Sequence, residues 1–173
     1  EIASCLVGSE MCIRDRRRTD REVTDAQKMK AILDRCKIVS YAMWDGKKPY
    51  AVVMNFGYEF TPEGKLRLYS HSALEGKKVS IICGICNKAA AIMECGERVV
   101  IDPEIPCKSG SAFQSIMASG TMKILQGSEA RHALEVFYRH QTGVVPPFPE
   151  GAENFVTMFC LECDEYTCKI CVK

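Results

Sequence analysis

The sequence predicts a mainly β fold, in which an antiparallel barrel carries helices packed on its outside. The predicted strands are joined mostly by short turns. The predicted helices stand at the start, after the third strand and before the last strand, so strands and helices do not alternate as they do in a parallel doubly wound sheet. The length of 173 residues and a hydrophobic content of 47% are typical of one folded domain.

Composition limits the partners and the location that we expect. Lysine and arginine total 23 against 22 aspartates and glutamates, which gives a net charge of +1. Such a chain has no overall field that attracts nucleic acid or an anionic membrane. No apolar run approaches the roughly 20 residues needed to span a bilayer. We therefore expect a cytoplasmic protein that binds neither nucleic acid nor membrane, with its 11 cysteines reduced.

The first sixteen residues require a separate interpretation. The string Glu10-Met11-Cys12-Ile13-Arg14-Asp15-Arg16 resembles the translation of a transposon adapter used in sequencing libraries. We interpret residues 1–16 as a non-native, adapter-derived tail and exclude them from the fold prediction. The predicted domain then covers residues 17–173.

The first elements are a helix and a β-hairpin. Apolar residues at helical spacing predict a helix over residues 25–35. Thr24 and Gln27 have the spacing of a capping box at its start. Next, the dipeptide Asp45-Gly46, which is suited to a tight turn, separates two strand-like runs. These runs cover residues 37–44 and 49–56.

Further strands follow, interrupted by two helical patterns. The turn Thr61-Pro62-Glu63-Gly64 leads into a strand, and a helical pattern begins after Ser70. A last helix begins at Ser128, and a proline-rich surface loop separates it from a final strand beginning at Phe155. The other predicted strands cover residues 65–70, 89–93, 97–101 and 113–125, and the loop covers residues 141–151.

The most informative stretch is Tyr-Ser-His-Ser-Ala-Leu-Glu-Gly-Lys-Lys at residues 69–78. Ser72 and Glu75 have the spacing of a second capping box. Two lysines near a helix start contradict the usual preference of cations for the helix C-terminus, and a bound anion would reconcile them. The alternative is a solvated helix start with two surface lysines. The candidate phosphate ligands are Ser70, His71, Ser72, Lys77 and Lys78.

The usual motifs of several enzyme classes are absent from the sequence. It contains neither G-x-G-x-x-G nor G-x-x-x-x-G-K-[ST], which argues against a dinucleotide-binding fold or a nucleotide triphosphatase. It also lacks the G-x-S-x-G elbow and the H-E-x-x-H zinc helix of common hydrolases.

At this point a family resemblance becomes visible. The sequence resembles the pyridoxamine 5′-phosphate oxidase-like FMN-binding split-barrel superfamily, and within it the nitroimidazole-resistance (nitroreductase-like) group. The resemblance extends roughly over residues 17–166, and its most specific part is His-Ser-Ala-x-Glu-Gly-Lys-Lys. The matching segments are residues 18–22, 49–50, 54–58 and 68–78.

The resemblance implies an antiparallel split β-barrel that binds FMN between two copies of the chain as a homodimer. Backbone groups of Val53, Met54 and Asn55 would border the isoalloxazine ring. The ribityl phosphate would be held by Ser70, His71, Ser72, Lys77 and Lys78, and Ser115 would lie near the cofactor. The catalytic residues are not identified: His71 could reach a substrate as a proton donor, and the alternatives, which we favour, are a structural histidine or a simple phosphate donor. The implied function is an FMN-dependent oxidoreductase acting on a small-molecule substrate or electron acceptor. Vitamin B6 phosphate is not the expected substrate, because no arginine follows Arg139.

Two alternatives remain open at this stage. A split barrel can hold FMN or haem as a carrier or sensor without turnover. The pairs Cys83/Cys86, Cys160/Cys163 and Cys168/Cys171 suggest a thiolate-metal protein, but the spacing of the last two pairs differs from common zinc and iron–sulfur patterns. We therefore expect no metal site. His132 and His140, on the last predicted helix, are expected to be solvated.

Overall fold

The computed structural model describes residues 19–172 of the chain. The interpretation of residues 1–16 as a non-native tail therefore lies outside the described residues. Within them, no helix has the length and apolar character needed to cross a membrane.

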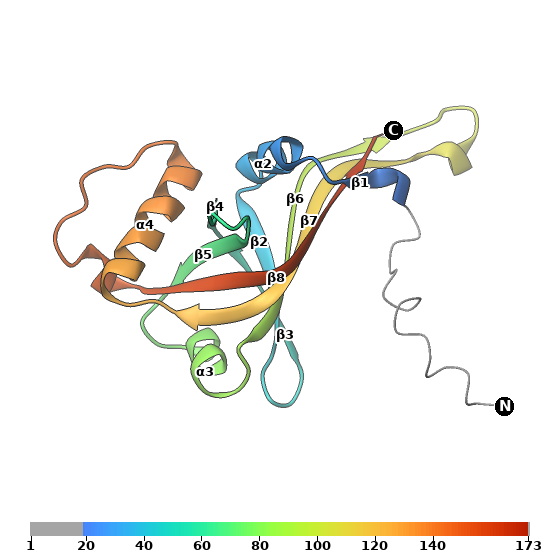
Figure 1. Ribbon diagram of the computed structural model, residues 1–173. Coiled ribbons are helices and arrows are strands. Elements are labelled where there is room, and N and C mark those ends of the chain that lie inside the picture. The colour runs from blue at the N-terminus through green and yellow to red at the C-terminus, as the bar shows by residue number, and fades with distance from the viewer. Residues whose placement is uncertain (1–18, 173) are drawn as a thin grey trace.

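One antiparallel sheet dominates the molecule (Figure 1). Its strands are β1 (Glu22–Val23), β2 (Ile38–Trp44), β3 (Pro49–Asn55), β4 (Gly57–Phe60), β5 (Leu66–Ser72), β6 (Lys88–Val100), β7 (Gly110–Ile124) and β8 (Thr157–Cys171). They lie in the order β3-β2-β6-β7-β8-β5-β4, and β1 pairs with β8. The helices are α2 (Ala26–Arg35), α3 (Lys77–Gly84) and α4 (Gly127–Thr142), with short 3-10 turns at Thr19–Arg21, Pro106–Lys108 and Ala152–Phe155.

The sheet closes into a barrel through a bend in the chain. Strands β3 and β4 form its two borders, yet Phe56 alone separates them in sequence. Near the bend, the Ser70 hydroxyl of β5 donates a hydrogen bond of 2.9 Å to the backbone oxygen of Asn55 in β3. The same hydroxyl lies 3.0 Å from the Tyr41 hydroxyl of β2. The predicted antiparallel barrel is therefore confirmed.

Alternation of side chains along the strands builds the interior. In β2, for example, Val39, Tyr41 and Met43 are buried and their neighbours are exposed, as a sheet with one face against a core requires. Helices α2 and α3 add Ile32, Leu33, Ile81 and Ile82 to the same core. In Figure 1, α2 lies above the barrel and α3 below it.

Helix α4 packs on the outside of the barrel, over β4, β5 and β8. A second apolar cluster lies beneath it, made of Tyr69, Leu125, Ala130, Ala133, Val136, Met158 and Cys160. The approach is close, because a Cβ at Gly57 would lie 2.4 Å from the Cα of Phe137. Only glycine at position 57 of β4 therefore allows the helix to lie directly against that strand.

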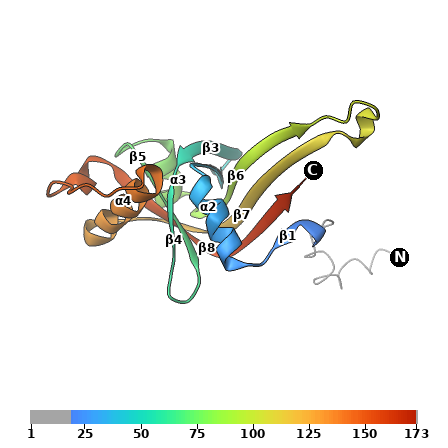
Figure 2. The same cartoon turned by 90° about the horizontal axis from the view of Figure 1, so that it is seen from above.

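The hairpin of β6 and β7 extends beyond the barrel as an arm (Figure 2). The sequence predicted two strands, 89–93 and 97–101, where the structure has the single strand β6. The prediction was wrong because Gly96 adopts a φ of 70° and absorbs an irregularity between Cys95 and Arg98 without ending the strand.

Both predicted capping boxes were also wrong. Helix α2 is capped by Asp25, whose carboxylate accepts a hydrogen bond of 2.8 Å from the Lys28 amide, and not by Thr24. Ser72 belongs to β5 and pairs with Thr157, so α3 begins later than predicted, with Gly76 at its N-cap. The expectation of solvated histidines was wrong for His140, which is partly buried and lies 2.7 Å from the Cys36 carbonyl oxygen.

Candidate functional site

The start of α3 is an open helix terminus. Its N-cap residue, Gly76, has φ 137° and ψ 175°, and no side chain of the described residues caps the first amides. The first two helical residues are Lys77 and Lys78. Unpaired amides and the helix dipole favour an anion at such a position, and two ammonium groups add to that preference.

Lys77 is held against the β2–β3 turn. Its ammonium group lies 2.5 Å from Asp45 Oδ2 and 4.8 Å from the centroid of the Tyr50 ring. Asp45 also accepts hydrogen bonds from the amides of Lys48 and Lys47. The Lys77 hydrogen bond, followed by these amides, holds the pKa of Asp45 well below its ordinary value. The ion pair fixes the start of α3 relative to β3.

Lys78 differs from Lys77 because no carboxylate in the described part of the chain forms an ion pair with it. It lies near His71, whose pKa is lowered first by burial and second by the Lys78 charge. The His71 ring packs edge-on against Phe137 of α4, with centroids 4.8 Å apart. The structure therefore brings an imidazole and an unpaired ammonium group together beside the open terminus of α3.

The two predicted serines of β5 lie in different environments. Ser72 is partly exposed at the end of the strand, and its hydroxyl donates a hydrogen bond to the Ala73 carbonyl oxygen at 3.0 Å. Ser70 is fully buried and its hydroxyl is engaged by Tyr41 and Asn55 inside the barrel. We therefore leave Ser70 out of the surface set that can meet a ligand.

The predicted ring-binding residues lie on β3, at the border of the sheet. Within the described residues β3 pairs only with β2, so its other side presents unpaired backbone groups. The Val53 side chain is 65% exposed, whereas Met54 packs against the core. The side-chain amide of Asn55 donates a hydrogen bond to the Lys37 carbonyl oxygen at 3.2 Å. This border therefore offers main-chain donors and acceptors next to the end of β5.

Within one chain, Ser115 does not lie near the end of β5 or the start of α3. It pairs with Lys169 of β8, whereas Ser70 pairs with Phe159 of the same strand. Phe159 and Lys169 are ten residues apart on β8, which corresponds to about 30 Å along the strand. Ser115 could join the site only as part of a second copy of the chain.

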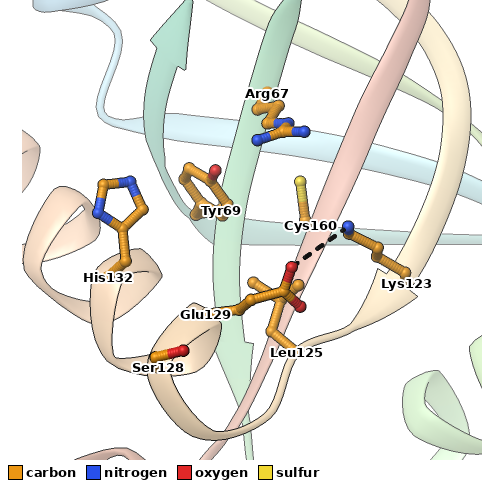
Figure 3. Close-up of a pocket in the computed structure, with 8 residues that line it drawn as sticks. All are labelled: Arg67, Tyr69, Lys123, Leu125, Ser128, Glu129, His132 and Cys160. Carbon is orange, nitrogen blue, oxygen red and sulfur yellow. Dashed lines mark ion pairs between the residues drawn. The ribbon is translucent and has the colours of Figure 1, made fainter. Parts of the chain in front are cut away.

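A cavity of about 230 Å³ lies under the start of α4 (Figure 3) and was missed by the sequence analysis. Its walls are Arg67, Tyr69, Lys123, Leu125, Ser128, Glu129, His132 and Cys160. Glu59 accepts hydrogen bonds from Tyr69 at 2.5 Å and from His132 at 2.8 Å, assuming His132 carries its proton on Nε2. Burial raises the pKa of Glu59, but these hydrogen bonds outweigh burial and the net pKa is lowered. The only sequence signal was the i, i+4 spacing of Ser128 and His132.

Comparison with solved structures identifies the fold. A scan of family models and a search of curated proteins found no match. A proposed 5-nitroimidazole antibiotic resistance protein from Bacteroides thetaiotaomicron matches with a TM-score of 0.71 and 26% identity over 86% of each chain. An FAD- and haem-binding protein from Mycobacterium smegmatis matches with a TM-score of 0.70 and 16% identity, over 88% of this chain and 74% of that one. A proposed pyridoxamine 5′-phosphate oxidase from Listeria innocua has a TM-score of 0.54 and 18% identity, over 83% of this chain and 95% of that one.

The chain thus has the split-barrel fold of the pyridoxamine 5′-phosphate oxidase-like proteins, and its structural neighbours include an FAD- and haem-binding protein. Within that class, the likeness to the Bacteroides protein extends over most of both chains. This finding agrees with the resemblance that the sequence motifs indicated.

Proposed function

We propose that the protein is an FMN-binding flavoprotein that transfers electrons to or from a small organic molecule. The observation that carries the proposal is the open start of α3, where Lys78 has no acidic partner among the described residues and stands beside His71. A dianionic phosphate would satisfy both the free amides and the ammonium group.

The residues present fit such a group. Lys78 and the first amides of α3 form a donor set of the kind that binds phosphate. The Ser72 hydroxyl would join this set by exchanging its hydrogen bond to the Ala73 carbonyl oxygen for one to the phosphate. Lys77 contributes less, because Asp45 already engages its ammonium group. His71 can donate a hydrogen bond to the phosphate or to a substrate from its partly buried position.

The border of β3 supports the placement of the ring. The border of β3 along Val53, Met54 and Asn55 turns alternate backbone groups away from β2, and those not already bonded, as the Asn55 oxygen is to Ser70, can bind the polar edge of a flat heterocycle. The exposed Val53 side chain supplies an apolar contact. When bound, FMN would supply hydride and single-electron transfer. The protein's part is to bind and orient the cofactor, and to place His71 as a proton donor nearby.

A homodimer is the proposed assembly, because one outer face of the sheet is apolar and exposed. Val53, Ser40, Ile92 and Met117 are neighbours in successive strands, and Val53, Ile92 and Met117 are 65%, 43% and 55% exposed. Single apolar side chains on a surface are ordinary, whereas three exposed apolar side chains in one row, with only Ser40 between Val53 and Ile92, favour an interface. The partly exposed Ser115 lies on β7 two residues before Met117, so it has the same orientation as Met117 along the strand and could reach the partner's cofactor.

The proposed reaction takes electrons from a reduced nicotinamide or another reductant and passes them to a quinone, nitro compound or similar acceptor. The FAD- and haem-binding neighbour favours a second candidate, a carrier or sensor that holds FMN or haem without turnover. The two candidates share the cofactor site and differ only in turnover.

The test is a titration of the cofactor-free protein with FMN, riboflavin, FAD and haem, followed by flavin fluorescence and visible absorbance. Because the phosphate would make several charge-assisted hydrogen bonds worth about 1.5–3 kcal/mol each, FMN should bind at least about 100-fold more tightly than riboflavin. Equal binding of FMN and riboflavin, or no flavin binding, would contradict the proposal. Consumption of reduced nicotinamide with an acceptor then separates the oxidoreductase from the carrier.

A further inference from the structure

Two cysteines that are distant in sequence meet at the base of the β6–β7 arm. Cys36 follows α2 as its C-cap and is fully buried. Cys95 lies in β6, immediately before the irregularity at Gly96. Both thiols are free in this structure, and neither belongs to the proposed FMN site.

The contact between the two residues is fixed by one carbonyl group. The backbone amide of Cys36 donates to the Ile32 carbonyl oxygen at 3.1 Å, and the Cys95 thiol lies 3.9 Å from the same oxygen. Burial raises the pKa of the Cys36 thiol, and the neighbouring Cys95 thiol raises it further by its charge and hydrogen bonding. Both residues therefore contact the same carbonyl oxygen, and their thiols are close enough to interact.

A second contact holds the end of α2 against the other strand of the arm, β7. The Arg35 guanidinium, at the end of α2, donates a hydrogen bond to the side-chain oxygen of Gln114 in β7. Gln114 is the residue that pairs with Cys95 in the sheet. Because Arg35 and Cys36 adjoin in sequence, this hydrogen bond places the last turn of α2 beside the Cys95–Gln114 pair.

The two thiols differ in access to solvent. Cys95 is partly exposed, whereas Cys36 is enclosed by the core. Of the C-x-x-C pairs in the sequence, Cys160 and Cys163 are poorly placed to form a disulfide with each other. Cys160 and Cys163 lie on one strand but in different apolar clusters, because residues i and i+3 of a strand point to opposite faces.

We propose that Cys36 and Cys95 are a covalent modification site, which a hydroperoxide oxidises to a reversible disulfide joining α2 to the base of the arm. The Cys95 thiolate attacks one peroxide oxygen and breaks the O–O bond, which leaves a sulfenic acid and, with hydrogen peroxide, releases one water. The Cys36 sulfur then displaces the sulfenic oxygen as a second water, and its proton leaves with that water. Two thiols and one peroxide thus give one disulfide and two waters, and a dithiol reductant reverses the change.

The bond would lie where β6 leaves the barrel. Gly96 follows Cys95 directly and has a left-handed backbone conformation that interrupts regular pairing with β7. A covalent link to α2 at this position would fix the direction of the arm relative to the barrel. Reduction would leave the Arg35–Gln114 hydrogen bond as the remaining side-chain contact described above.

The experiment is peptide mapping of the full wild-type chain by mass spectrometry under non-reducing conditions, before and after hydrogen peroxide. We expect a peptide pair joined through Cys36 and Cys95, lighter by two hydrogens than the sum of its parts, in most molecules after oxidation. Treatment with dithiothreitol should separate the pair. If peroxide oxidises the exposed Cys83 and Cys107 while Cys36 and Cys95 remain unlinked, the proposal is overturned.

Matched variants test the assignment. Cys95→Ser should abolish the linked pair, while Cys107→Ser, which changes an exposed thiol near the tip of the arm, should leave it unchanged. Limited proteolysis of the arm should slow by about tenfold or more in oxidised wild-type protein, and Cys95→Ser should show no such slowing. A joined Cys95–Cys107 peptide in place of the Cys36 linkage would also overturn the proposal. None of these measurements requires bound FMN, so they stand or fall independently of the proposed function.

Discussion

Helices α2 and α3 enter the same barrel core but begin in opposite ways. Each contributes two large aliphatic side chains to the interior, Ile32 and Leu33 from α2, Ile81 and Ile82 from α3. The start of α2 is satisfied by the Asp25 carboxylate. The start of α3 has a glycine cap, no side-chain partner within the described chain, and two lysines. One helix start therefore serves stability, and the other is available to an external anion.

The largest effect should come from removing the unpaired cation at α3. Lys78→Ala loses a charge-assisted hydrogen bond to phosphate worth about 1.5–3 kcal/mol, so the FMN dissociation constant should rise roughly 10- to 100-fold. Lys28→Ala is the matched control, because Lys28 occupies the first turn of the capped helix α2. Equal losses of affinity in both variants would show that the two helix starts do not differ in anion binding.

Gly76→Ala should give the next largest effect, on stability. At φ 137° and ψ 175° the backbone of residue 76 has a conformation reserved for glycine, and alanine there costs about 1–3 kcal/mol. No described atom lies within 4 Å of the added Cβ, so the cost is backbone strain and not a clash. Urea unfolding measures it. Gly84→Ala, at the other end of the same helix, should be neutral or stabilising by up to about 1 kcal/mol.

Asp25→Ala tests the closed helix start. Loss of the side-chain cap should lower the free energy of unfolding by about 1 kcal/mol and leave the FMN dissociation constant unchanged. Thr24→Ala provides the comparison, because the sequence pattern predicted Thr24 as the cap and the structure assigns that role to Asp25. A greater loss of stability in Thr24→Ala than in Asp25→Ala would contradict the structure.

The smallest effect concerns the pH dependence of stability at His71. Burial, followed by the Lys78 charge, lowers the His71 pKa in the folded protein. The unfolded chain therefore binds a proton more readily as the pH falls below about 6.5, and this group reduces stability from there until the pH reaches the folded pKa. His71→Gln should lose less stability than wild type between neutral and mildly acidic pH in urea unfolding. Bound FMN should reduce this difference between the variant and wild type, because the negative phosphate would offset the repulsion between Lys78 and protonated His71.

Much of the fold was predictable because the strands obey simple periodicity. The alternation in β2 and the Asp45-Gly46 turn gave the first hairpin correctly. Local pattern could not distinguish two short strands from one long β6, because Gly96 disturbs the alternation without ending the pairing. It also could not show that His140 is partly buried, since that burial depends on Phe56 in the bend after β3 and on Tyr58 of β4, both distant in sequence.

The candidate site was predictable as a segment but not as a geometry. The order of His71, Ser72 and the two lysines in the sequence indicated an anion site near one helix start. The burial of Ser70 depends on Tyr41 and on the bend after β3, and the pairing of Lys77 depends on Asp45 in another hairpin. Such contacts join residues far apart in the chain and leave no local signal. The roles of the predicted site residues toward FMN remain predictions that the titrations above can test.

The bend at Phe56 joins the two border strands of the barrel, β3 and β4, directly in sequence. Only Phe56 lies between the end of β3 and Gly57, and the backbone of α4 lies directly against Gly57. A molecule bound along β3 would therefore lie two residues in sequence from the contact on which α4 packs, although β3 and β4 are opposite borders of the sheet.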